Sequence, residues 1–428
     1  METKKLFLVG LASLCMMSTA VAEIHPQKRY VEVGVDLSLA AMQNAYTITD
    51  IMVKDLVIDL TKLAQDLPDY GFAANVGVDT KAYFNMDFNR WGLGVFAQVT
   101  GNFDLGLSKD IFTFLGEGIQ VGDQNVTSVS MGLESYAEVG VPIKAKVGKV
   151  TIRATPSVYV PLVYVPQPNA TITVTNGYDG SITAVASADF AMYSFVDLSS
   201  AFAGGSFSGF DGILDELKAI DIQSTLLNKG GIDLNATIEY AVTRAFDLGV
   251  YAHVPIKPAT LDYKTSGNVS FTASVNPVLN SLIGGNGFSY SFDGPTFSGI
   301  QCSNVSSAVN RPFRLGAELA FRPFNGKDWF ILNASAGVAA TNPFGQDFDW
   351  ATSLYPEYSV SADVTLAYIL GFNATTSYIN HMFTQSFGVR VNLRLVEVDV
   401  SVASSSADFL KSWMLAGATA YAGVKFGF

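Results

Sequence analysis

The residue types that can carry catalysis are few in this sequence. Its three histidines are His25, His253 and His381, and histidine is the side chain that most readily acts as a base near neutral pH. A hydrolytic site needs a nucleophile close to such a base, yet the residues two positions after His253 and His381 are Pro255 and Phe383. The sequence therefore predicts that the protein is not an enzyme.

Metal and cofactor chemistry has equally little support. The sequence contains two cysteines, Cys15 and Cys302, and neither belongs to a cluster of cysteines and histidines with the spacing of a zinc site. We therefore expect no metal site and no cofactor, and the sequence assigns no role to Cys302. The formal net charge of −12 argues against a nucleic-acid partner, because such partners require a basic surface.

Charged side chains recur instead in segments where polar and apolar residues alternate. Between Val31 and Leu39 every second residue is apolar, and Glu32 and Asp36 occupy intervening positions. A period of two predicts a β-strand with one apolar and one polar face. The same alternation places a set of charged residues on polar strand faces: Glu32, Asp36, Arg153, Glu239, Arg314, Glu318, Arg390 and Arg394.

The overall composition indicates what the two strand faces meet. The chain is 49% hydrophobic and 15% charged, yet after its N-terminal segment it has no long apolar run that would form a membrane helix. Apolar content spread over alternate residues is typical of a transmembrane β-barrel, whose apolar residues face lipid and whose polar residues face the lumen. The predicted fold class is all-β, a single transmembrane antiparallel β-barrel with short helices in its extracellular loops.

Two interpretations of the lumen-facing charges remain open. In the first, they form a salt-bridged interior that keeps the barrel rigid. In the second, they form a selectivity ring, in which Arg390 and Arg394 face carboxylates on neighbouring strands and discriminate between solutes by charge.

The N-terminal residues predict export. Two lysines precede an apolar run from Leu6 to Met17, and small residues follow up to Ala22. This is the pattern of a secretory signal peptide, so we assign 1–22 to the signal peptide and 23–428 to the barrel. A lipoprotein anchored through Cys15 fits less well, because bulky apolar residues flank that cysteine.

The final strand carries a second targeting signal. Tyr421, Gly423, Phe426 and Phe428 form the pattern Tyr-x-Gly-x-x-Phe-x-Phe within a segment of alternating apolar residues. This pattern resembles the C-terminal assembly signal of bacterial outer-membrane β-barrels. The resemblance implies location in the outer membrane of a diderm bacterium, with outer-membrane lipid and the barrel-assembly machinery as partners. A buried strand of a soluble sandwich is the alternative.

The connections between predicted strands alternate between short turns and long loops, and outer-membrane barrels carry their long loops on the extracellular side. The predicted long loops span 41–71, 108–125, 165–230 and 257–310. Within the third, Asn176-Gly177 predicts a small hairpin. The apolar positions change parity between Leu395 and Val396. A hairpin there, which we prefer, gives about fourteen strands, and a bulge gives about twelve.

Three of the long loops are predicted to contain a helix with an apolar face, at 49–67, 109–115 and 211–220. The candidate ligand-binding residues on these faces are Val53, Leu56, Leu60, Ile213 and Leu217. Two interpretations stay open. The helices either pack on one another as a cap or plug, or form an exposed apolar platform that captures hydrophobic ligands.

About fourteen strands with helices in the extracellular loops resemble the FadL-type family of long-chain fatty-acid transporters. That family places a plug segment with an Asn-Pro-Ala motif before its first strand, whereas here the first predicted strand begins close to the mature N-terminus. A similar triplet, Asn342-Pro343-Phe344, lies late in the chain. The resemblance therefore implies transport of hydrophobic molecules but carries over no ligand-binding or gating residue.

Taken together, these patterns favour an outer-membrane transporter or pore for uptake of hydrophobic or amphipathic small molecules such as fatty acids. Two alternatives remain. A surface-exposed adhesin or antigen would use the barrel as an anchor for its long loops. A general porin would pass small polar solutes without a dedicated binding site.

Overall fold

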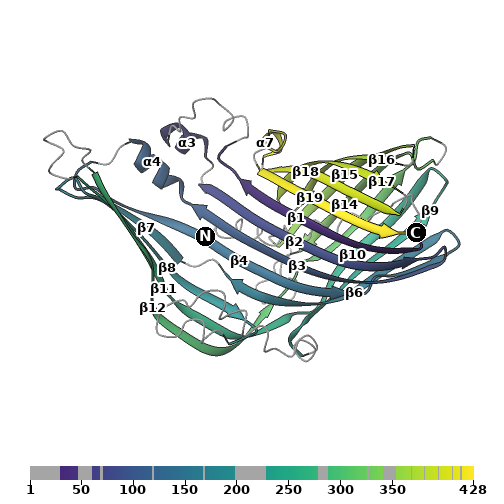
Figure 1. The fold of residues 1–428 in the computed structure, drawn as a ribbon, viewed down its shortest axis with the longest axis horizontal. Helices are drawn as coiled ribbons and strands as arrows, with labels where there is room; N and C mark the ends of the chain where they lie inside the picture. The colour runs from purple at the N-terminus through teal and green to yellow at the C-terminus, as the bar shows by residue number, and fades with distance from the viewer. Residues whose placement is uncertain are drawn as a thin grey trace.

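The computed structural model contains one antiparallel sheet that closes into a barrel (Figure 1). The structure describes residues 29–46, 60–67, 71–117, 120–166, 169–197, 228–277, 288–324, 327–340, 353–367, 369–379, 381–393, 395–406, 408–414 and 417–428. The predicted signal peptide, 1–22, lies outside the described residues.

Within the described residues, nineteen strands form the sheet. Their bounds are β1 Val31–Gln43, β2 Phe72–Asp87, β3 Trp91–Leu107, β4 Gln124–Gly140, β5 Ile143–Val147, β6 Val150–Val165, β7 Asn169–Asn176, β8 Ile182–Ser194, β9 Gly231–Ala241, β10 Phe246–Lys257, β11 Ala259–Pro277, β12 Phe288–Val309, β13 Phe313–Phe321, β14 Phe330–Ala340, β15 Leu354–Leu366, β16 Leu370–Ile379, β17 Met382–Asn392, β18 Val396–Ser406 and β19 Gly417–Gly427.

Hydrogen-bonded pairing closes the wall of the barrel. The closed circuit runs through β1, β2, β3, β4, β6, β9, β10, β13, β14, β15, β16, β17, β18 and β19. β19 returns to β1, with Glu32 opposite Gly427 at one end and Met42 opposite Gly417 at the other. Each strand of the circuit has a neighbour on both sides. Its backbone N–H and C=O groups therefore form hydrogen bonds to neighbouring strands and do not need water.

The predicted total of about fourteen strands is too low, because the described residues form nineteen. Five of them, β5, β7, β8, β11 and β12, lie outside the closed circuit. The prediction missed β11 and β12 and did not separate β5 from its neighbours. The hairpin predicted at the parity change is confirmed, because β17 ends at Asn392, β18 begins at Val396 and the two strands pair antiparallel. The alternative with a bulge and about twelve strands is therefore wrong.

β5 continues the line of β4, since both pair with β3 on one side and β6 on the other. Pro142 interrupts the ladder because proline has no N–H to donate. The ladder is maintained around it, since Gly94 N–H donates to the Pro142 carbonyl at 2.8 Å and Val141 N–H donates to the Pro156 carbonyl at 3.0 Å. β5 therefore extends the wall of the barrel beyond the predicted end of the strand at Val141.

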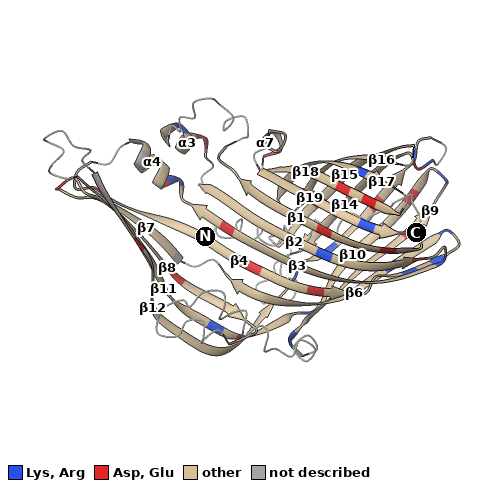
Figure 2. Cartoon of the chain, in the orientation of Figure 1, with Lys and Arg blue, Asp and Glu red and all other residues tan. Residues whose placement is uncertain are grey.

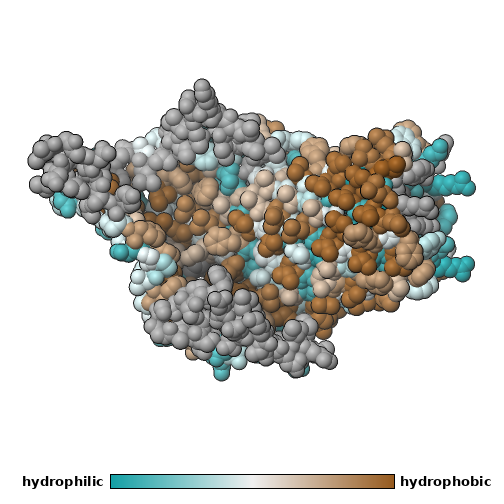
Figure 3. All heavy atoms as spheres, viewed as in Figure 1, coloured by the Kyte–Doolittle hydropathy of each residue, from teal (hydrophilic) through white to brown (hydrophobic). Residues whose placement is uncertain are grey.

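Alternation along the strands sorts side chains between lipid and lumen. On β3, Val95 and Val99 are 45% and 47% exposed, whereas Gln98, Thr100 and Asn102 are buried. Figure 3 shows the resulting apolar surface across the barrel wall, with hydrophilic residues at the end that carries the C-terminus. An apolar outer face around a polar interior is the arrangement of an outer-membrane barrel.

Aromatic side chains border the apolar surface. At the end with the short turns, the ring centroids of Phe88 and Trp91 are 4.4 Å apart, and those of Phe324 and Trp329 are 4.3 Å apart. Near the opposite end, Trp413 is 52% exposed directly after helix α7, Phe409–Ser412. Such aromatic girdles mark the two interfaces between lipid and water.

One side of the wall continues past the closed circuit, at the left in Figure 1. β7 pairs with the first residues of β4, and β8, β11 and β12 follow in order. Segments 165–230 and 257–310 are therefore not irregular loops throughout, because pairing against an existing strand satisfies even a serine-rich backbone. The small hairpin predicted at Asn176-Gly177 is confirmed by β7 and β8. We call these four strands the extension.

Two further helices are described, α3 Leu60–Asp66 and α4 Lys109–Glu117. They pack against each other and bury Leu63, Leu67 and Ile111, and the Lys109 amine donates to the Leu67 carbonyl at 3.0 Å. The apolar side chains described here thus support the cap interpretation. The predicted helix at 211–220 and the first part of the one at 49–67 lie outside the described residues. Among the described residues, no helix is long and apolar enough to cross a membrane.

Candidate functional site

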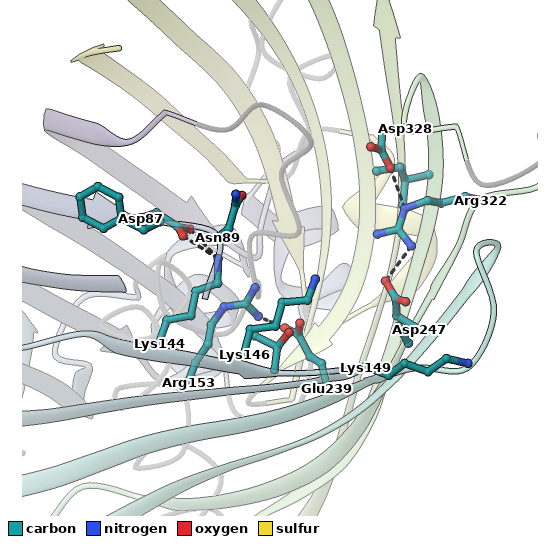
Figure 4. Close-up of a pocket in the computed structure, with 14 residues that line it drawn as sticks. Asp87, Asn89, Lys144, Lys146, Lys149, Arg153, Glu239, Asp247, Arg322 and Asp328 are labelled. Atoms are coloured by element: carbon teal, nitrogen blue, oxygen red, sulfur yellow. Dashed lines mark hydrogen bonds and ion pairs between the residues drawn. The ribbon is translucent and has the colours of Figure 1, made fainter. Parts of the chain in front are cut away.

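A cavity of about 300 Å³ lies at the short-turn end of the barrel (Figure 4). Its lining comes from the β2–β3 turn, the β5–β6 hairpin and strands β9, β10, β13 and β14 with their turns. Five basic and four acidic residues line it. Figure 2 shows that charged residues gather towards this end of the molecule. We call this space the mouth cavity.

One wall of the mouth cavity holds two ion pairs. The amine of Lys144, on β5, lies 2.7 Å from both carboxylate oxygens of Asp87 at the end of β2. Arg153, on β6, forms an ion pair with Glu239 of the neighbouring strand β9. The alternation of β5 and β6 directs these four side chains to the same side of the wall, as Figure 4 shows.

The facing wall is organised around Arg322, which follows β13. Its Nη1 donates to Asp247 at 2.7 Å and its Nε donates to Asp328 at 2.8 Å. Figure 4 shows this group across the cavity from the first two pairs. Each of these carboxylates therefore forms an ion pair with a basic side chain. The ion pair offsets the free energy that desolvating the carboxylate requires.

A second interior cluster surrounds Arg311, in the segment that joins β12 to β13. Its Nη1 donates to Glu138 at 2.6 Å and to Asp233 at 3.1 Å. The guanidinium carbon also lies 4.1 Å from the ring centre of Tyr159 and 5.3 Å from that of Tyr136. Because the partners come from β4, β6 and β9, Arg311 fixes the β12–β13 connection to the inner wall.

His253 extends the Arg311 cluster onto β10. Its Nδ1 lies 2.7 Å from the side-chain oxygen of Asn235, and its Nε2 lies 3.7 Å from Asp233, which is fully buried. The hydroxyl of Tyr159 donates to the Val309 carbonyl at 3.0 Å. Arg311, Asp233 and His253 are all buried, so we interpret the cluster as a structural junction.

A third cluster joins β17, β18 and β19 to the start of the described chain. Arg29 lies 3.4 Å from Glu397, and Lys425 lies 3.5 Å from the same carboxylate. Asp399 is 3.3 Å from Lys425 and 3.7 Å from Arg390. Neighbouring lumen positions thus alternate in sign, which is the pattern expected of a salt-bridged interior.

The structure places the predicted charged residues in three different surroundings. Arg153 and Glu239 line the mouth cavity, Glu32 and Arg390 belong to the third cluster, and Arg314 pairs with Glu357 at 3.2 Å. The described residues of this set therefore do not converge on a single ring.

Asp36 accepts a hydrogen bond from the hydroxyl of Tyr421 at 2.9 Å across the β1–β19 seam. Glu318 packs against the backbone of Gly249, where a Cβ would come within 2.5 Å of the carboxylate. Arg394 lies outside the described residues. The set thus contains both wall-closing contacts and cavity-lining residues.

The candidate ligand-binding residues are largely beyond the described part of the chain. Val53, Leu56, Ile213 and Leu217 are not described, and Leu60 is the first residue of α3. Their role in binding a hydrophobic ligand stays a prediction.

The four residues of the predicted assembly signal lie on or directly after β19. Phe426 and Phe428 are 56% and 72% exposed on the outer face, whereas Tyr421 faces inward to Asp36. Gly423 permits this contact, because a Cβ there would come within 2.6 Å of both Asp36 and Tyr421. Their role in assembly stays a prediction.

Sequence reasoning missed Arg311, Arg29, Arg322 and Glu357 as members of these clusters. One available signal was the Arg-Pro-Phe triplet, which occurs at 311–313 and again at 322–324, immediately before and after β13. An arginine at each end of a strand indicates charged contacts at both ends of the lumen. The partners of each arginine, however, depend on strand register.

Comparisons with known proteins identify barrels of similar architecture. No protein-family model and no curated protein matches the chain. Among solved structures, the CymD monoaromatic hydrocarbon channel has 10% identity, covers 94% of this chain and 89% of its own, and gives a TM-score of 0.47. The Pseudomonas putida toluene transporter TodX has 11% identity, coverage of 94% and 91%, and a TM-score of 0.44.

A FadL homologue from Pseudomonas aeruginosa has 10% identity, covers 94% of this chain and 91% of its own, and gives a TM-score of 0.41. FadL-type barrels are thus among the solved structures to which this chain is weakly similar, in line with the resemblance predicted from the sequence. Similarity at these values concerns the barrel shape, so no solute or binding residue is transferred from these proteins.

Proposed function

We propose that the protein is an outer-membrane transporter or pore for small hydrophobic or amphipathic molecules. The observation that carries the proposal is the mouth cavity, an interior space in a membrane-spanning barrel, lined by lysine, arginine and carboxylate side chains. A barrel that serves only as an anchor needs no such space. A passage for solutes requires interior volume and polar groups directed into it.

The apolar side chains in and beside the extension support a hydrophobic solute. Two apolar clusters there share Phe190 and Phe297, whose ring centroids lie 6.3 Å apart. Side chains packed against them, among them Leu162, Met192 and Ile300, keep part of their surface exposed. Apolar surface outside the closed circuit of strands offers a first contact for a hydrophobic solute.

Two measurements on purified, refolded protein test this proposal. Equilibrium dialysis in detergent measures binding of a labelled fatty acid, and planar-bilayer recording measures ion conductance. We expect saturable binding of the fatty acid together with low or intermittent conductance. Absent binding with a steady open conductance would contradict the hydrophobic solute and favour a general porin.

A surface-binding protein is the second candidate, and the β11–β12 hairpin favours it. The two strands have 19 and 22 residues, and both are rich in serine, threonine and asparagine. A hairpin of this length presents a large polar surface to a partner. The absence of both fatty-acid binding and ion conductance would contradict transport and support this alternative.

A further inference from the structure

More basic than acidic side chains line the mouth cavity. Each carboxylate that lines it already has a basic partner. Asp87 is held by Lys144, Glu239 by Arg153, and both Asp247 and Asp328 by Arg322. Glu318, which does not line the cavity, also interacts electrostatically with Arg153. Two lysines of the lining are left after this pairing.

These two lysines differ in their surroundings. The Lys149 amine donates to the Val242 carbonyl at 3.1 Å and lies 5.9 Å from the ring centre of Tyr240. Lys146 forms no ion pair with any acidic residue of the described ranges. Figure 4 shows its amine directed into the space between the two walls. Lys146 therefore presents an unneutralised charge to whatever enters the cavity.

The same cavity has an apolar part of its lining. Ile331, which is 2% exposed, and Ala241 contribute to it. The volume of about 300 Å³ is at the small end of the range for small-molecule sites. A cationic group beside apolar surface matches a short amphiphile with a negatively charged head.

We propose that the mouth cavity binds the carboxylate of a short amphipathic solute, with Lys146 as the main recognition residue and Ala241 and Ile331 beside its apolar part. The proposal rests on the proposed transport function for the arrival of the solute in the lumen. A carboxylate beside Lys146 gains a charge-assisted hydrogen bond and neutralises the surplus charge.

Isothermal titration of the full protein in lipid nanodiscs tests the site, with sodium octanoate as the probe and empty nanodiscs as the blank. We expect octanoate to bind the unmodified protein. Lys146→Gln should weaken binding by roughly tenfold, and Lys146→Glu should weaken it further. Lys411→Gln and Lys411→Glu, on helix α7 near the opposite end of the barrel, are the matched controls and should bind octanoate normally.

Two further probes test the charged contact and the apolar contact separately. Acetate should bind more weakly than octanoate, because it lacks the apolar part, and 1-octanol should bind more weakly because it lacks the charge. Equal octanoate affinity for the unmodified protein and Lys146→Glu would overturn the site. Equal affinity for acetate and octanoate would overturn its amphiphilic character.

Failure of this site is distinguishable from failure of the transport function. Normal fatty-acid binding by Lys146→Glu, with octanoate affinity unchanged, overturns the site and leaves transport standing. Suppose instead that octanoate binding depends on Lys146, but the protein neither binds a labelled long-chain fatty acid nor conducts ions. This result would overturn the transport function and leave a charged binding site in the mouth cavity.

Discussion

At the scale of single residues, Arg311 carries the largest concentration of interior contacts described above. It is buried, bridges Glu138 and Asp233 and lies against two tyrosine rings. A buried ion pair adds little stability compared with a well-packed apolar group of the same volume. Removing one partner is different, because the remaining charges are then buried without compensation.

We therefore expect Arg311→Leu to destabilise the folded barrel by about 3–5 kcal/mol. The measurement is urea unfolding in detergent, followed by the change in gel mobility between the folded and the unfolded chain. Combining Arg311→Leu with Glu138→Gln and Asp233→Asn removes the stranded charges and should restore much of the loss. Equal stability of the single and the triple variant would contradict this account of the cluster.

At the scale of elements, each strand of the closed circuit directs alternate side chains into lipid and into the lumen. On β18, Val400 is 51% exposed on the lipid side, and Ser401 follows on the opposite face beside Gly388. Adjacent residues of one strand therefore experience lipid and lumen respectively. The same substitution at both positions tests the assignment of faces without changing the element.

Val400→Arg should be far more harmful than Ser401→Arg. The first places a charge in lipid at a cost of about 2–4 kcal/mol near the bilayer midplane, and the second places it in a polar lumen. The yield of folded, membrane-inserted protein, determined by gel mobility after membrane extraction, gives the comparison. Equal yields of the two variants would mean that the faces of β18 are assigned wrongly.

The helix pair α3–α4 is a second element whose packing is testable. Leu67, the residue directly after α3, is 3% exposed, whereas Gln65 on α3 is exposed. We expect Leu67→Ala to loosen α3 without unfolding the barrel, since truncating a buried leucine removes about 2–5 kcal/mol of packing. Faster tryptic cleavage after Lys62, with unchanged gel mobility of the barrel, is the expected result. Gln65→Ala is the control, and the same cleavage rate in both variants would argue against a packed cap.

At the scale of the whole molecule, the circuit of strands behaves as one cooperative unit. Leu37 lies in the middle of β1 and is paired with Ala422 of β19 and Thr80 of β2. Because β1 has a neighbour on both sides, a proline there removes a hydrogen bond that no water replaces within lipid. A proline at this one position is therefore expected to prevent the whole barrel from closing.

Leu37→Pro should abolish the form of the protein that resists denaturation by detergent at room temperature. Tyr178→Pro, in the exposed turn between β7 and β8, should leave that form intact. Gel mobility of heated and unheated samples measures both. A folded, denaturation-resistant Leu37→Pro variant would show that the β1–β19 seam is not required for the closed barrel.

The wall strands were predictable because alternation is a local property. The alternation around Val33 and Val35 locates β1 without any knowledge of its partners. β12 was not predictable in this way, since its ladder depends on β11 and its composition resembles that of a loop. Strand formation there follows from pairing, which is a tertiary property.

The interior clusters were predictable only in part. Period two correctly places Glu239 and Arg153 on polar strand faces, yet their pairing depends on the β6–β9 register, in which Arg153 lies opposite Thr237. Arg311 belongs to no strand, so alternation carries no information about it. Charges that meet across a barrel are set by strand tilt and register, and a single sequence does not contain these quantities explicitly.

The seam between β1 and β19 has a consequence for the order in which the molecule is made. The hydrogen bond from Tyr421 to Asp36 joins residues separated by 385 positions. Ribosomal synthesis completes β1 long before β19 exists, and the entropy of bringing such distant segments together opposes their meeting. Until then both strands are open edges that other chains can extend by pairing. We therefore expect the β1–β19 pairing to form last. The fraction of protein that aggregates before insertion then depends on how well the free edges of β1 and β19 are shielded from other chains.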